Sequence, residues 1–110
     1  MKYVLDIPAI VYRDIKGIEN YIALDNPSAA KKISAKIFKT IESFEESPLG
    51  GFELRKKFDI GTDLCGKFVE PYIIVFKVKG NIIRIYRVLD ARSDYLVRLG
   101  LLPETDLDEE

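Results

Sequence analysis

Apolar side chains between residues 8 and 47 recur at the three- and four-residue spacing that is typical of amphipathic helices. In the first half of this region they are Val11, Ile15, Ile18 and Ile22. In the second half they are Ala30, Ile33, Ile37, Ile41 and Phe44, with Phe38 beside them. Asn26 and Pro27 lie between the two halves, and an asparagine followed by a proline is a typical helix start. The pattern predicts two helices joined by almost no loop, which is an αα-hairpin.

Most of the remaining chain alternates apolar and polar side chains, as half-buried β-strands do. The alternation predicts strands at residues 2–7, 52–58, 68–78 and 82–89, with a tight turn at residues 79–81. In the longest of them the side chains expected to share the core face are Phe68, Tyr72, Ile74, Phe76 and Val78. Pro71 indicates a bulge or a sheet edge, and Ser93 is expected to cap a last helical turn that ends at Gly100. The order β-α-α-β-β-β predicts an α+β fold, with the helical hairpin packed on a small and mainly antiparallel sheet.

Length and composition are those of one small domain. The chain has 110 residues, of which 47% are hydrophobic and 32% charged, and this balance suits a packed core under a solvated surface. The charge is uneven, because the stretch from Glu104 to Glu110 contains five acids and no base. We expect a single domain over residues 1–103, followed by a disordered acidic tail at 104–110. The remaining mildly basic body suits either an ordinary solvated surface or contact with an acidic partner or nucleic acid.

Several kinds of site are excluded by residue types that the sequence lacks. Histidine is absent and Cys65 is the one cysteine, so neither a Cys/His zinc site nor a disulfide framework is expected. The same absence leaves Cys65 without an imidazole to activate it as a nucleophile. The first residues contain no long apolar segment of a signal peptide, and no run approaches the roughly 20 apolar residues of a membrane span. We therefore expect a cytoplasmic protein that needs no metal, cofactor or membrane.

A set of short motifs follows one another in a characteristic order over residues 3–96. They are Asp14-Ile15, residues 18–22, Asn26-Pro27 with Ala29-Ala30, residues 37–43, Pro48-Leu49-Gly50, residues 69–76 and residues 85–92. In this order and spacing the chain resembles the RelE/ParE toxins of type II toxin–antitoxin systems. The resemblance implies a cognate antitoxin as partner, a small protein whose extended or helical tail wraps the hairpin and the sheet.

The resemblance also implies one of two activities. RelE-like members cut mRNA in the ribosome, whereas ParE-like members bind and block DNA gyrase. RNA cleavage needs a base, an acid and cations around the phosphate, and the nuclease branch carries an arginine where this chain has Ile73. Of the basic cluster that the nuclease branch has after the last strand, only Arg92 is present. We therefore favour gyrase inhibition without an active site, and keep a ribosome-dependent mRNA endoribonuclease and an inactive antitoxin binder as alternatives.

The residues expected at these sites follow from the same comparison. If the protein is a nuclease, the catalytic candidates are Arg87, Arg92, Tyr95 and Lys67. The candidates for contact with the target are Arg87, Arg92, Lys56 and Lys57. The candidates for contact with the antitoxin are Tyr21, Ile73 and Val75. Two structural alternatives remain open: Arg87 could form an ion pair with Asp90 or Glu70, and Lys56 and Lys57 could be ordinary solvated cations.

Overall fold

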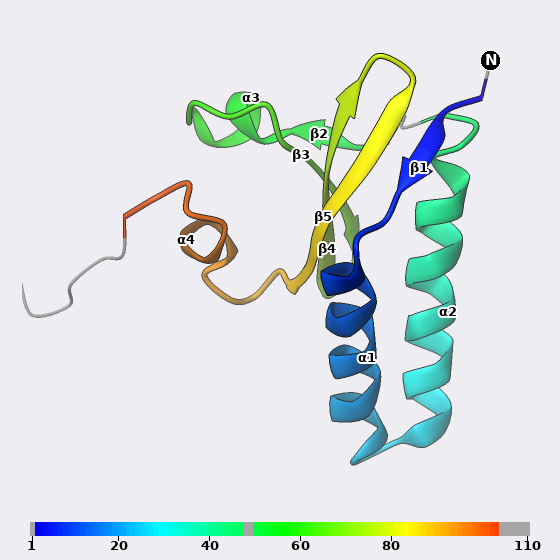
Figure 1. The fold of residues 1–110 in the computed structure, drawn as a ribbon. Helices are drawn as coiled ribbons and strands as arrows, with labels where there is room; N and C mark the ends of the chain where they lie inside the picture. Colours follow the sequence, from blue (N-terminus) through cyan, green and yellow to red (C-terminus); the bar gives the residue numbers. More distant parts are fainter. Residues whose placement is uncertain (1, 48–49, 104–110) are drawn as a thin grey trace, which may run out of the picture.

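A computed structural model of the chain describes residues 2–47 and 50–103. A five-stranded sheet in the order β1-β5-β4-β3-β2 forms its centre (Figure 1). The strands are β1 (Val4–Asp6), β2 (Phe52–Glu53), β3 (Cys65–Val69), β4 (Tyr72–Lys79) and β5 (Ile82–Asp90). The helices are α1 (Ala9–Ala23), α2 (Pro27–Ser43), α3 (Leu54–Phe58) and α4 (Tyr95–Arg98). The fold is thus the predicted α+β architecture, while the expected tail at 104–110 lies outside the described residues.

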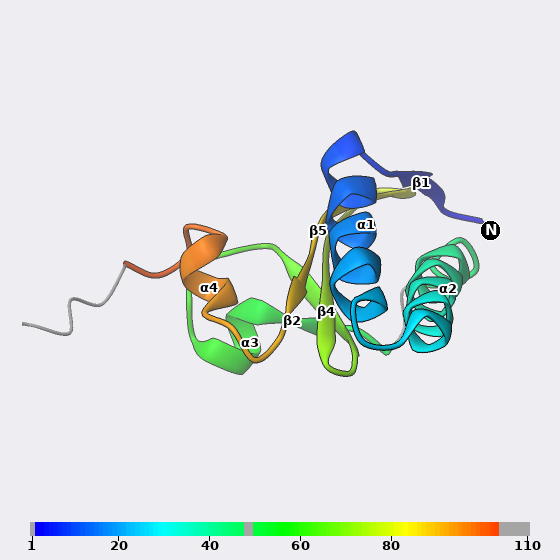
Figure 2. The same ribbon diagram turned by 90° about the horizontal axis from the view of Figure 1, so that it is seen from below.

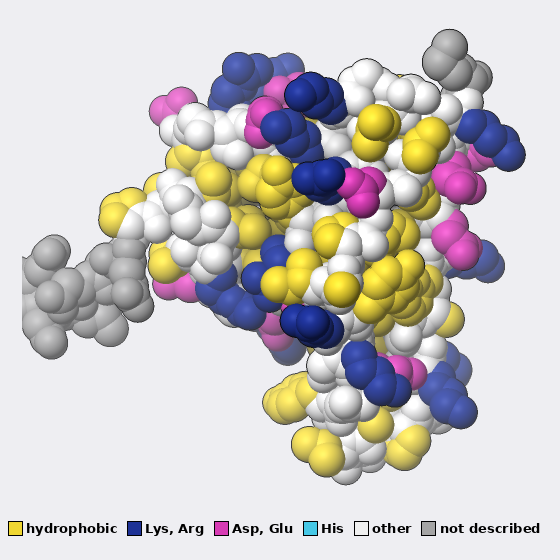
Figure 3. Space-filling view, in the orientation of Figure 1, with side chains coloured by type: hydrophobic (Ala, Val, Ile, Leu, Met, Phe, Trp, Pro, Cys, Tyr) yellow, Lys and Arg dark blue, Asp and Glu magenta, His cyan; other side chains and the backbone are white. Residues whose placement is uncertain are grey.

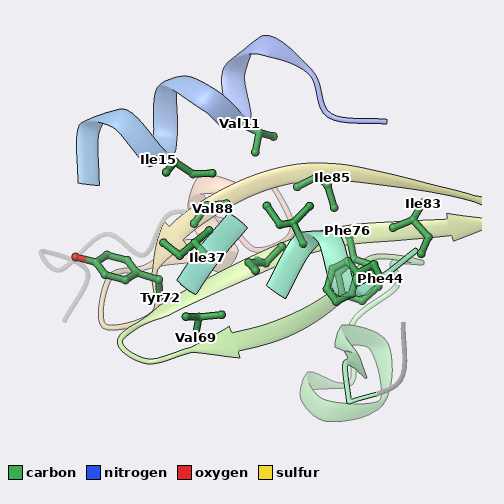
Figure 4. Close-up of a cluster of buried hydrophobic side chains, with 12 residues drawn as sticks. Val11, Ile15, Ile37, Phe44, Val69, Tyr72, Phe76, Ile83, Ile85 and Val88 are labelled. Atoms are coloured by element: carbon green, nitrogen blue, oxygen red, sulfur yellow. The ribbon is translucent and has the colours of Figure 1, made fainter. Parts of the chain in front are cut away.

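The helical hairpin covers one face of the sheet, and α3 and α4 lie on the opposite side (Figure 2). Asn26 caps α2 as predicted, because its side chain accepts a hydrogen bond from the N–H of Ala29 at 3.0 Å. Side chains of the predicted helical stripes pack on the inner faces of β4 and β5 (Figure 4). The buried members of this cluster are Val11, Ile15, Ile37, Ile41, Phe44, Val69, Tyr72, Ile74, Phe76, Ile83, Ile85 and Val88. The pattern of apolar residues therefore located both the hairpin and its core.

The predicted long strand at residues 68–78 is in fact two strands, β3 and β4, which pair antiparallel on either side of a turn at Pro71. Proline has no N–H to donate to a sheet ladder, so a continuous strand does not pass through it. Phe68 lies opposite Ile73 across the pair and therefore shares the face of Ile73 rather than that of Tyr72. Alternation counted straight through the turn assigned Phe68 to the wrong face.

The predicted strand at residues 52–58 is also wrong over most of its length. Only Phe52 and Glu53 pair with β3, and the helix α3 follows at once. Leu54 starts this helix, is fully buried, and donates its N–H to the carbonyl of Leu64. The run Arg55-Lys56-Lys57 suits a helical turn, since arginine and lysine are good helix formers. The burial of Leu54 in the folded protein thus sets where α3 begins.

β5 contains a bulge that changes the direction of its later side chains. Phe76 lies opposite Ile85, but the preceding Val75 lies opposite Arg87, so Tyr86 is an extra residue on β5. From Arg87 onward the alternation is therefore reversed. Strict alternation counted from Ile83 and Ile85 predicts that Arg87 shares their core face, and it fails at this point.

The chain itself covers the second face of the sheet. Ile73 and Val75 are both 0% exposed. They belong to a second buried cluster, whose other members are Leu54, Leu64, Leu89 and Tyr95. The prediction that an antitoxin contacts Ile73 and Val75 is therefore corrected, because the segments around α3 and α4 occupy that face. The alternation showed that the face is apolar but not which part of the chain covers it.

The C-terminal helical turn is present, with one correction to its start. Gly100 ends it with a positive φ of 76°, as a glycine after a helix commonly does. Ser93 is not its cap, because the Ser93 hydroxyl donates to the carbonyl of Asp90 at 2.6 Å. Asp94 holds the N-cap position without a side-chain hydrogen bond. Within the described residues, no helix has the length and apolar character needed to cross a membrane.

Candidate functional site

The candidate site lies where β5 runs past the end of β1. β1 pairs with β5 only as far as Asp6 opposite Arg84, and among the described residues no strand follows on that side. Asp14 of α1 takes the place of a strand partner further along β5. Its Oδ2 atom accepts a hydrogen bond from the backbone N–H of Val88 at 3.0 Å. A side chain of the helix thus satisfies an N–H at the sheet edge.

The same carboxylate also accepts two hydrogen bonds from the guanidinium of Arg87. The Nε atom of Arg87 donates to Oδ2 of Asp14 at 2.7 Å, and Nη2 donates to Oδ1 at 2.9 Å. The side chains are only 27% and 11% exposed, and these hydrogen bonds raise the pKa of the Arg87 guanidinium. The ion-pair alternative for Arg87 is therefore the one seen, but its partner is Asp14 rather than Asp90 or Glu70. This pair connects α1 to β5.

Asp90 and Arg92 form a second, more exposed pair at the end of β5. Arg92 donates to Asp90 through Nε at 2.9 Å, through Nη2 at 2.7 Å and through its backbone N–H at 2.8 Å. These bonds hold the pKa of Asp90 below its ordinary value. The Arg92 side chain is 68% exposed, so it is oriented by Asp90 and still accessible to a partner.

Two grooves meet beside these pairs. The groove between α1 and the end of β5, here called the α1 groove, has a volume of about 390 Å³. It is lined by Arg13, Asp14, Gly17, Ile18, Tyr21, Tyr72, Val88, Leu89, Asp90 and Arg98. The groove between the helical hairpin and the β3–β4 turn, here called the α2 groove, has a volume of about 440 Å³. It is lined by Tyr21, Ile22, Ala29, Lys32, Ile33, Lys36, Pro71, Tyr72 and Arg92. Tyr21 and Tyr72 belong to both grooves, which therefore form one continuous surface.

The two tyrosines have different environments. Tyr72 is buried, and Figure 4 shows its hydroxyl at the end of the core cluster, pointing away from the other side chains. Tyr21 is 72% exposed, and Leu24, three residues further along the chain, is also well exposed. Figure 3 shows hydrophobic side chains on the surface at the tip of the hairpin, where α1 and α2 meet. Exposed apolar surface next to a groove is typical of a protein-binding site.

Cations border both grooves without carboxylate partners of their own. Arg13 and Arg98 border the α1 groove, and Lys32 and Lys36 border the α2 groove. Within the described residues, none of these four side chains forms an ion pair. The two carboxylates in the lining are Asp14 and Asp90, and both are already paired with arginines. The joined grooves therefore present an apolar floor with a net positive rim.

The four nuclease candidates do not come together. Arg87 is held by Asp14, and Arg92 by Asp90. Tyr95 is 9% exposed in the second core cluster, where burial raises its pKa. Lys67 lies on β3 and donates to the carbonyl of Gly50 at 3.4 Å. Within residues 2–47 and 50–103 there is also no group of three metal-ligating side chains that could hold an ion.

The remaining target candidates, Lys56 and Lys57, lie on α3 and line a different groove. Lys56 forms an ion pair with Glu53 at 3.5 Å. The ammonium of Lys57 lies over the rings of Phe52 and Phe58, at 5.4 and 5.8 Å from their centroids. The structure thus separates the candidates for target contact into Arg87 with Arg92 near the joined grooves and the lysine pair on α3.

Cys65 lies in β3 rather than in a loop. Burial and the nearby carboxylates of Glu53 and Asp63 raise the pKa of its thiol. A raised pKa means less thiolate at any pH near neutrality, so we expect alkylation by iodoacetamide to be several-fold slower in the native protein than in urea at pH 7.5. Mass spectrometry of the quenched reaction would measure both rates. Equal or faster labelling of the native protein would show that the thiol is activated.

Two solved structures share this arrangement of helical hairpin and sheet. The structure is similar to that of the chromosomal ParDE toxin–antitoxin system from P. aeruginosa, with a TM-score of 0.65 and 21% sequence identity over 81% of this chain and 96% of that chain. It is also similar to the toxin–antitoxin complex RelBE2 from Mycobacterium tuberculosis, with a TM-score of 0.60 and 16% identity over 82% of this chain and 99% of that chain. At these identities the two structures show a shared fold. Among curated proteins, no sequence matches the chain significantly.

The sequence itself identifies the family. The profile of the family described as the ParE toxin of the type II toxin–antitoxin system parDE matches residues 11–95. The chain therefore belongs to this family, and it is a toxin of the RelE/ParE type, as the order of its motifs predicted.

Sequence reasoning located some site residues and missed others. Tyr21 was expected to contact an antitoxin, and it lies at the junction of the two grooves. Asp14 and Gly17 were not singled out as site residues, although Asp14 stood in one of the family motifs. The sequence did contain a signal at Gly17, because a glycine in the middle of an amphipathic helix weakens the helix and indicates a packing or functional reason.

Proposed function

We propose that this toxin inhibits DNA gyrase, and that its antitoxin neutralises it by occupying the joined α1 and α2 grooves. The observation that carries the first part is the dispersal of the nuclease candidates. Phosphodiester cleavage requires cations and an acid–base pair around one phosphate. Here Arg87 is immobilised against Asp14 of α1, and Tyr95 is buried in the second core cluster. The match to the ParE family supports the same target, since ParE-like members of the superfamily act on gyrase.

The grooves suit an antitoxin for three reasons. Their shared wall contains the exposed ring of Tyr21 and the edge of the buried Tyr72, and tyrosine is common at protein interfaces. Their floor is largely apolar, whereas their rim carries unpaired cations that suit an acidic partner. Arg92 lies in the α2 groove and is the most accessible of the candidates for target contact near it. An antitoxin bound there would cover Arg92, which links binding to neutralisation.

Purified toxin is therefore expected to block supercoiling of relaxed plasmid by purified DNA gyrase and to leave mRNA intact in a reconstituted translation system. Arg92→Ala should weaken the inhibition by about tenfold, because it removes one exposed cation from the proposed contact. Arg84→Ala is the matched control, since Arg84 is equally exposed and paired with Asp6 at the other end of β5. It should inhibit as the unmodified toxin does.

The alternatives predict different results in the same assays. Cleaved mRNA with normal supercoiling would establish the endoribonuclease and refute the gyrase proposal. Normal supercoiling, intact mRNA and no growth defect on induction, together with tight binding to the antitoxin, would identify a member that only binds its antitoxin. Equal loss of inhibition in both arginine variants would show that net charge, rather than Arg92, governs the contact.

A further inference from the structure

Gly17 lies in the middle of α1, and no contact with residues 2–47 or 50–103 requires a glycine there. Glycine weakens a helix interior relative to alanine, because it loses more conformational freedom on folding. Its φ is not positive, so the backbone itself does not require glycine. A Cβ at this position would meet nothing within 4 Å, whereas one at Gly66 would come within 2.9 Å of Ile73 and Phe52. Within the described residues, packing therefore explains Gly66 but not Gly17.

The position of Gly17 in the α1 groove suggests an external reason. Gly17 is part of the groove lining, together with Ile18 of the same helix and residues 88–90 of β5. The absence of a side chain leaves the backbone of α1 accessible from the groove. Glycine commonly occurs where another chain must approach a backbone closely.

The opposite wall of this groove is an unpaired strand edge. Past Arg84, no strand in the described part of the chain pairs with β5 on the side of α1. Asp14 satisfies the N–H of Val88, and the alternation of the ladder directs the N–H of Asp90 towards the same edge. An exposed edge of this kind can pair with an extended segment of a partner. The groove thus offers backbone contact on one wall and an open helix surface on the other.

Charge indicates the chemistry of that segment. Arg13 and Arg98 border the groove, and neither forms an ion pair with a described carboxylate. The acids in the lining, Asp14 and Asp90, are neutralised by Arg87 and Arg92. An extended chain with acidic side chains complements this arrangement better than a basic or neutral one.

We infer that Gly17 is the point at which an extended, acidic segment of the antitoxin crosses α1 in direct contact with the helix backbone. Because residue 17 has no side chain, the antitoxin can approach the backbone of α1 closely. Gly17 therefore determines which partners fit into the α1 groove. This inference rests on the proposed antitoxin groove and adds the residue that limits its width.

The test uses variants in which stability and binding should change in opposite directions. Gly17→Ala should raise the Tm of the toxin by about 2–6 °C, because alanine favours the helix. The same change should weaken the complex with the antitoxin encoded beside the toxin gene by about tenfold, and Gly17→Leu by more than about a hundredfold. Complexes purified after co-expression would be compared by their dissociation rates, measured by exchange with labelled antitoxin. Ala35→Leu places the same leucine side chain at an exposed position of α2 outside both grooves and should leave the dissociation rate unchanged.

A second variant tests the proposed antitoxin groove separately from the role of Gly17. Tyr21→Asp puts a charge at the junction of the grooves and should speed dissociation if the antitoxin binds there. Fast dissociation of Tyr21→Asp with unchanged dissociation of both Gly17 variants would overturn the role of Gly17 and leave the groove in place. Unchanged dissociation of all three variants would overturn the groove itself.

Discussion

Replacing Asp14 by alanine is expected to lower the free energy of unfolding by about 2–3 kcal/mol. The change leaves the Arg87 guanidinium and the N–H of Val88 without their shared acceptor in a largely buried setting. An unsatisfied buried donor costs more than the hydrogen bond contributes when it is made. Urea denaturation followed by circular dichroism would measure the change in the free energy of unfolding.

An exposed pair on the same strand provides the control. Arg84 and Asp6 also form an ion pair at 2.8 Å between β5 and β1, but their side chains are 60% and 42% exposed. Asp6→Ala should therefore cost no more than about 1 kcal/mol. The double variant Asp14→Ala/Arg87→Ala should recover part of the loss, since it removes the unpaired charge together with its partner. If Asp14→Ala costs no more than Asp6→Ala, the pair does not hold α1 against β5.

Replacing Ile73 by alanine is expected to lower the free energy of unfolding by about 2–5 kcal/mol, because the side chain is fully buried between β4 and the segments around α3 and α4. The cavity left behind would lie in the second core cluster, away from the grooves. Urea denaturation would give the stability, and the dissociation rate of the folded variant's complex with antitoxin would report on binding. We expect that rate to be unchanged.

Ile82 provides the comparison for Ile73. It has the same side chain in β5 but is 47% exposed, so Ile82→Ala should change the free energy of unfolding by less than about 1 kcal/mol. Much faster dissociation of the Ile73→Ala complex, together with a small effect on stability, would mean that a partner reaches this face. That result would restore the prediction made from the sequence.

The bulge and the turn show where reasoning from alternation stops. A period of two identifies strands, but it does not reveal an extra residue such as Tyr86 or a reversal of direction at Pro71. Each of these features changes which face later side chains occupy. The errors at Phe68 and Arg87 both have this origin.

The sequence by itself determined the helical hairpin, the class of fold and the family. These depend on local signals, such as the Asn26 cap and the helical spacing of apolar residues, or on the order of short motifs. Tertiary structure alone decided the site. The pair that joins Arg87 to Asp14 connects residues 73 positions apart, and Gly17 and Tyr21 line a groove only because α1 packs beside the unpaired edge of β5. The local sequence pattern determines which face of a helix or strand is apolar, whereas strand register and tertiary packing determine which residues that face contacts.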